Sequence, residues 1–187
     1  LDWLARPWFY AVSGNHEDRA IRWPRGQNVG GVWVRNMPTG HYVQNGGSWN
    51  VSNPPDVSAE FAAAFAALPV AIELETEAGL VGIVHADVPG GDWVEFVAAL
   101  AAGGARGANA IDKAQWSRAR IDAHLSGFPT SPVVGVHAVV VGHTPLDAPT
   151  VVANVHYIDT KGWRESGRFT LLDAHTLRPA EPPSALR

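Results

Sequence analysis

Three apolar runs in this sequence each end in a turn that carries a histidine. With the residues that lead into them, these are Ala11-Val12-Ser13-Gly14-Asn15-His16, Gly82-Ile83-Val84-His85 and Val139-Val140-Val141-Gly142-His143. Runs of this kind predict strands, and loops converge at the strand ends of an α/β sheet to present ligands and catalytic groups. The pattern therefore predicts an α/β fold in which three imidazoles and one carboxamide are available to a metal site.

Each histidine also has a purely structural interpretation. His16 suits a tight turn after a glycine, His85 suits a buried ring bonded to backbone, and His143 suits a cap on a turn through Thr144. The repeated order of strand, histidine and loop favours a functional site over three separate structural roles.

Composition removes several classes of protein. The chain lacks cysteine, which excludes disulfide scaffolds and thiolate metal sites and leaves its 8 histidines as the main ligand candidates. A net charge of −4 without a basic stripe argues against a nucleic-acid partner. The longest apolar stretch, residues 61–72, is short for a membrane span and contains Pro69, so no membrane partner is expected.

The remaining pattern predicts helices alternating with strands. Helices are expected at 58–68 with Ser58 as the N-cap, at 96–102 after a capping pair of Asp92 and Glu95, and at 112–126. Strands are expected at 8–12, 70–76, 80–84, 133–141, 151–158 and 168–172, with hairpins over 70–84 and near 155–172. This order predicts a mixed sheet with flanking helices in a single domain.

The histidine motifs resemble a known family. Gly14-Asn15-His16-Glu17, Val84-His85-Ala86-Asp87 and Val141-Gly142-His143-Thr144 look like later motifs of the phosphoprotein phosphatases, within the calcineurin-like metallophosphoesterases. The resemblance is to the lambda-phage-type and bacterial serine/threonine protein phosphatases. Supporting matches in family order are Pro7–Val12, Gln44–Trp49, Trp116–Ile121 and Tyr157–Thr160. The resemblance implies a four-layer α/β/β/α sandwich.

The resemblance also implies a site with two divalent metal ions, manganese first, with iron or zinc as alternatives. Asn15, His85 and His143 would be metal ligands. His16 would be the general acid toward the leaving alkoxide, while a hydroxide activated by the two metals attacks phosphorus. Arg118 would bind the substrate phosphate, with Arg120 as the alternative because helix register is uncertain by a residue or two.

The sequence departs from the family pattern in three places. The family motifs Gly-Asp-x-His-Gly and Gly-Asp-x-x-Asp-Arg-Gly, which supply the ligands of the first metal, are absent. Residues 1–187 are therefore expected to be one metallophosphoesterase domain without its N-terminal β-α-β portion. Ser13 stands where lambda-type enzymes carry an arginine. Lys161 stands where a glycine is expected, so this position is predicted to need permissive backbone angles.

The resulting expectation is a phosphomonoester hydrolase of the protein phosphatase type, in the cytoplasm, with a phosphoprotein or small phosphoester as substrate. Two alternatives stay open. One is a dinucleoside polyphosphate hydrolase of the same superfamily. The other is a non-catalytic fragment or pseudo-phosphatase that binds a partner. The sequence does not indicate an oligomeric state.

Overall fold

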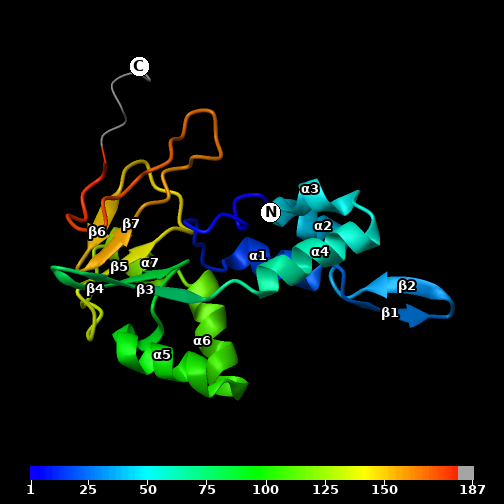
Figure 1. Ribbon diagram of the computed structural model, residues 1–187, viewed down its shortest axis with the longest axis horizontal. Coiled ribbons are helices and arrows are strands. Elements are labelled where there is room, and N and C mark those ends of the chain that lie inside the picture. Colours follow the sequence, from blue (N-terminus) through cyan, green and yellow to red (C-terminus); the bar gives the residue numbers. More distant parts are fainter. Residues whose placement is uncertain (181–187) are drawn as a thin grey trace. The chain divides into compact units, whose positions relative to one another are not determined.

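A five-stranded mixed sheet forms the centre of the second of two units into which the chain divides, between Pro69 and Val70. The computed structural model describes residues 1–180 (Figure 1). The sheet has the order β3-β4-β5-β7-β6, in which β4, β5 and β7 run parallel and the two edge strands run antiparallel to their neighbours. Its strands are β3 (Ala71–Thr76), β4 (Gly79–Val84), β5 (Ala138–Val141), β6 (Thr150–Val152) and β7 (Val155–Tyr157).

The predicted hairpin over residues 70–84 is confirmed. Ala71 pairs with Val84 at one end of the β3–β4 hairpin, and Thr76 pairs with Gly79 beside the turn. All four residues of β5 are buried, as expected of a parallel strand covered on both faces. The β-branched run that ends in Gly142-His143 is therefore the central strand of the sheet.

Three helices and a short turn pack with this sheet around one apolar core. They are η2 (Pro89–Gly91), α5 (Trp93–Ala102), α6 (Gly104–Trp116) and α7 (Ala119–Leu125). Trp93 lies over Gly82 so closely that a Cβ there would be 2.4 Å from the indole. The predicted cap is confirmed, because the Asp92 carboxylate accepts a hydrogen bond from the Glu95 amide at 3.0 Å.

Several predicted elements of this unit are shorter than expected or broken. The helix predicted at 112–126 is interrupted by Ser117 and Arg118, which separate α6 from α7. The run 133–141 forms a strand only in its last four residues, since Gly135 has a left-handed φ of 78°. The strand predicted at 151–158 is instead the β6–β7 hairpin, with Ala153 at φ 55° in its turn.

The strand predicted at 168–172, and with it a hairpin near 155–172, is wrong. β7 already has β5 and β6 as neighbours, so both of its edges are occupied. Arg168 forms an isolated bridge with Lys161 and Leu172 forms one with Pro179, so neither residue belongs to a strand.

The first unit is mainly helical and carries a separate two-stranded hairpin (Figure 1). Its elements are α1 (Asn15–Arg22), β1 (Gly26–Val29), β2 (Val32–Arg35), α2 (Thr39–Tyr42), the kinked segment η1 (Val43–Gly47), α3 (Ser48–Val51) and α4 (Pro55–Ala66). Trp23 stacks on Tyr42 with ring centroids 4.4 Å apart. The fully buried Asn50 hydrogen-bonds to Tyr42 and Ser58 at 3.1 and 3.0 Å.

Two predictions in this unit are wrong. Residues 8–12 form no strand, since none of the described strands pairs with them and Tyr10 is 76% exposed. Ser58 is not the N-cap of its helix, because Pro54 and Pro55 start α4 three residues earlier. The Ser58 hydroxyl is instead buried as the donor to Asn50.

None of the helices within residues 1–180 combines the length and the apolar character that crossing a membrane requires. The four-layer sandwich and the description of 1–187 as a single domain stay predictions.

Candidate functional site

His85 and His143 lie side by side at the carboxyl ends of two neighbouring parallel strands. His85 directly follows β4, and His143 follows β5 after Gly142. The Nε2 atom of His85 is 3.2 Å from the Nδ1 atom of His143, and the ring centroids are 5.0 Å apart. The predicted convergence of strand-end histidines is thus observed for this pair.

Backbone geometry holds the pair in place. The amide of Gly142 donates to the carbonyl of His85 at 2.9 Å, which joins the two loops directly beyond the strands. His143 has a left-handed φ of 63°, a conformation that few residues other than glycine adopt. The Trp116 indole lies edge-on to the His143 ring at a centroid distance of 6.4 Å.

The donor atoms of this pair fit a divalent transition-metal ion. Ligand nitrogens about 2.1 Å from a four-coordinate ion are roughly 3.4 Å apart, close to the separation of the two imidazole nitrogens. Imidazole nitrogen suits iron and zinc, whereas manganese is better served by oxygen ligands such as carboxylate and carbonyl groups. Among residues 1–180, however, no group of three or more His, Asp or Glu side chains has the geometry of a metal site. The pair therefore supplies two candidate ligands, fewer than a complete metal site needs.

Asn15 and His16 belong to the first unit, where they open helix α1. The Glu17 carboxylate accepts a hydrogen bond from the Gly14 amide at 2.8 Å, which fixes the start of the helix. In the Gly-Asn-His-Glu sequence, the glutamate therefore caps the start of the helix on which the asparagine and the histidine lie. Asn15 is partly buried, whereas His16 is exposed.

The exposed ring of His16 lies against Gly46. A Cβ at Gly46 would be 2.7 Å from Cε1 of His16, and this glycine has a left-handed φ of 82°. His16 and Gly46 line a small hollow together with Asn45 and Trp49. The stretch Gln44–Trp49 is therefore the neighbour of His16, a role that sequence reasoning did not assign to it.

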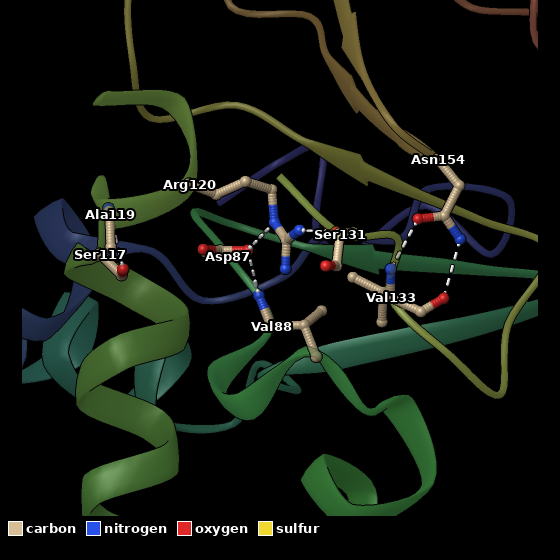
Figure 2. Close-up of polar contacts among 8 residues, drawn as sticks. All are labelled: Asp87, Val88, Ser117, Ala119, Arg120, Ser131, Val133 and Asn154. Carbon is tan, nitrogen blue, oxygen red and sulfur yellow. Dashed lines mark hydrogen bonds and ion pairs between the residues drawn. The ribbon is translucent and has the colours of Figure 1, made fainter. Parts of the chain in front are cut away.

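Arg118 and Arg120 differ sharply in their surroundings. Arg118 is exposed in the break between α6 and α7, and its side chain has no hydrogen bond or ion pair with the other described residues, 1–180. Arg120 instead donates from Nε to the Asp87 carboxylate at 3.0 Å and from Nη1 to the Ser131 carbonyl at 2.5 Å (Figure 2). Because Arg120 is committed to these groups, Arg118 is the arginine that is available to a phosphate.

Asp87 links Arg120 to the loop that follows β4. Its Oδ1 atom accepts from both Arg120 and the Val88 amide, the latter at 2.8 Å. Asn154 fixes the neighbouring segment, since its side chain accepts from the Val133 amide and donates to the Val133 carbonyl (Figure 2). Sequence reasoning missed Asn154, and its position in the tight β6–β7 turn was the available signal.

The known proteins to which this chain is similar include two from Salmonella typhimurium (strain LT2). The chain is 33% identical over 160 residues to serine/threonine-protein phosphatase 2, an alignment that covers 84% of this chain and 64% of that protein. It is 30% identical over 173 residues to serine/threonine-protein phosphatase 1, which covers 90% of this chain and 67% of that protein. No family model matches the chain.

The chain belongs to the serine/threonine-protein phosphatase family. The two alignments extend over most of this chain and about two thirds of each relative. Membership of a protein phosphatase family, expected from the histidine motifs, is thereby confirmed. The roles of Asn15, His16, His85, His143 and Arg118 in this phosphatase-family chain stay predictions.

Proposed function

We propose that this protein is a metal-dependent phosphomonoesterase that hydrolyses phosphoserine or phosphothreonine in proteins. The names of the two relatives support the substrate class. The observation that carries the metal dependence is the 3.2 Å approach of the His85 and His143 ring nitrogens at the ends of β4 and β5. A cytoplasmic location, too, is proposed from the sequence alone.

His85 and His143 are proposed as ligands of a divalent metal ion, with the Asn15 side chain as an amide oxygen ligand. Manganese is the first choice and iron or zinc the alternatives, because the amide oxygen suits manganese and the imidazole nitrogens suit iron and zinc. When bound, two such ions would neutralise charge on the phosphate oxygens and activate the attacking water.

His16 is proposed as the general acid. Its ring is exposed at the start of α1 and lies against Gly46, so a substrate can reach it. Serine and threonine leave as alkoxides, which are poor leaving groups unless a proton is delivered to the departing oxygen. Arg118 is proposed to hold the phosphate, since a planar guanidinium can donate to two phosphoryl oxygens at once.

The test compares the protein with its His16→Asn variant in the presence of Mn²⁺, on a phosphoserine peptide and on p-nitrophenyl phosphate. Loss of a general acid typically costs about 10²–10⁴-fold in rate. The loss should be larger on the peptide, because p-nitrophenolate needs less protonation as it leaves. His124→Asn is the matched control, since His124 is exposed on α7 and has no proposed role.

Absence of hydrolysis of either substrate by the unaltered protein would overturn the proposal. Equal rates for the protein and for His16→Asn on the phosphopeptide would overturn the role of His16. Faster hydrolysis of diadenosine tetraphosphate than of the phosphopeptide would assign the chain to the dinucleoside polyphosphate hydrolases instead.

A further inference from the structure

A basic hollow of about 570 Å³ lies in the first unit, between helix α1 and the base of the β1–β2 hairpin. The chain as a whole is acidic, with a net charge of −4, yet three arginines and a histidine converge here with one carboxylate. The lining residues are Asp18, Arg19, Ile21, Arg22, Arg25, Asn36, Met37, Pro38 and His41.

The local charges leave a net positive hollow. Arg22 is paired with Asp18 through Nε and Oδ1 at 2.8 Å. Nη1 of Arg19 lies 2.5 Å from Nε2 of His41, and because a guanidinium can only donate, that ring nitrogen accepts. Arg25 is exposed, and its side chain has no ion pair or hydrogen bond with the other residues of the described segment 1–180.

The hairpin gives Arg25 a fixed place at the rim. Asn36 donates its amide hydrogen to the Arg25 carbonyl at 3.0 Å, which closes the base of the hairpin. Ile21, Met37 and Pro38 supply apolar wall between the charged groups. Such a hollow can take the methylene stem of an acidic side chain while the guanidinium groups meet its anionic end.

The position of the hollow relative to His16 limits what can occupy it. His16, Arg19 and Arg22 follow one another at three-residue spacing on α1, so Arg19 lies about 4.5 Å and Arg22 about 9 Å further along the helix axis. An extended peptide advances about 3.3–3.6 Å per residue. A group that reaches Arg19 or Arg22 from a residue beside His16 is therefore about one to three residues away in the peptide.

We infer that the hollow lined by Arg19, Arg22 and Arg25 binds an anionic side chain of the substrate, about one to three residues from the phosphorylated residue. This inference rests on the proposed function, because it takes His16 as the point at which the phosphate reacts. The anion is a carboxylate or a second phosphate, since a guanidinium fork recognises both.

The test measures kcat/KM of the full chain with Mn²⁺ on three phosphoserine peptides of equal length. One has alanine on both sides, one has aspartate three residues before and after the phosphoserine, and one has phosphoserine at those positions. We expect kcat/KM to be about three- to tenfold higher for the anionic peptides than for the alanine peptide, because of a lower KM. An effect of this size corresponds to one or two partly exposed charge-assisted contacts. The better of the two identifies the anion.

Arg25→Gln should lower kcat/KM on the anionic peptides toward its value on the alanine peptide, and so remove most of this preference. Arg6→Gln is the matched control, because Arg6 is an exposed arginine of the same unit outside the hollow. Equal kcat/KM for the three peptides, or the same loss in Arg6→Gln as in Arg25→Gln, would overturn the inference.

The two proposals can fail separately. If the full chain hydrolyses no substrate, the proposed function fails. Fluorescence anisotropy with labelled peptides then still tests whether the hollow binds an anionic side chain. Tighter binding of the anionic peptides that is lost in Arg25→Gln would then support the hollow as an anion site. Equal affinity for all three peptides would overturn it.

Discussion

Arg120 and Asp87 form an ion pair at 3.0 Å in which only 11% and 10% of the two side chains are exposed. Removing one partner of a buried pair leaves the other charge without compensation. We therefore expect Arg120→Gln to lower the free energy of unfolding by about 3 kcal/mol, measured by urea denaturation. A change below about 0.5 kcal/mol, the range of ordinary surface substitutions, would contradict the structural role of the pair.

Arg118→Gln should leave stability unchanged and lower activity. Its side chain is exposed and unpaired within residues 1–180, so the free energy of unfolding should change by less than about 0.5 kcal/mol. If Arg118 holds the phosphate, kcat/KM should fall about 10- to 100-fold through loss of charge-assisted hydrogen bonds. Full activity of Arg118→Gln would remove it from the proposed site.

Metal binding should depend on both rings of the histidine pair. At an Mn²⁺ concentration about 100 times the Kd, binding should raise the free energy of unfolding by about 2.7 kcal/mol. His85→Asn and His143→Asn should each abolish most of this gain, whereas His124→Asn should keep it. Metal content by elemental analysis and unfolding with and without Mn²⁺ provide the measurement. Undiminished metal content in both variants would show that the ions bind elsewhere.

Asn50 should be the most sensitive polar residue of the first unit. It is fully buried, it donates to Tyr42 and it accepts from Asn53 and Ser58. Asn50→Ala leaves the buried Ser58 hydroxyl without its acceptor, so we expect a loss of about 2–4 kcal/mol in the free energy of unfolding. Asn53→Ala removes one hydrogen bond of the same network and should cost about 1 kcal/mol. Equal losses in the two variants would argue against this network.

Stability should fall as the pH drops through the range in which His156 titrates. Burial, with a smaller contribution from His137, lowers the pKa of His156 below its ordinary value of 6.5. The unfolded chain then takes up a proton that the folded protein does not, so acid favours unfolding. Urea denaturation between pH 7 and pH 5 should give a steeper loss of stability for the protein than for His156→Gln. Identical slopes would rule out this contribution.

Local patterns predicted the parts of the fold that depend on neighbouring residues. Alternation and a glycine turn identified the β3–β4 hairpin, and the Asp92 cap followed from its spacing to Glu95. Lys161 adopts a left-handed φ of 62°, which confirms that this position needs permissive backbone angles. The β1–β2 hairpin was missed, although Gly30 and Gly31 lie between its strands and are a strong hairpin signal.

Features that depend on distant parts of the chain were harder to predict. The contact of His85 with His143 could be expected because both follow buried strands. The commitment of Arg120 to Asp87 could not, since the two are 33 positions apart and the break at Ser117 and Arg118 carries no glycine or proline. The basic hollow was likewise hidden, because Arg25 and His41 are brought toward α1 only by a hairpin that was not predicted.

The contact between His85 and His143 depends on the pairing of two strands that are far apart in the sequence. His85 and His143 are separated by 58 positions and meet only after β5 has docked beside β4. Long-range strand pairing of this kind is slow compared with helix formation, because a long loop must close before any contact is gained. A chain still being synthesised has released His85 well before His143 exists. If the two rings bind a divalent metal ion as proposed, both can reach it only after β5 has paired with β4, so metal uptake would report on this long-range strand pairing.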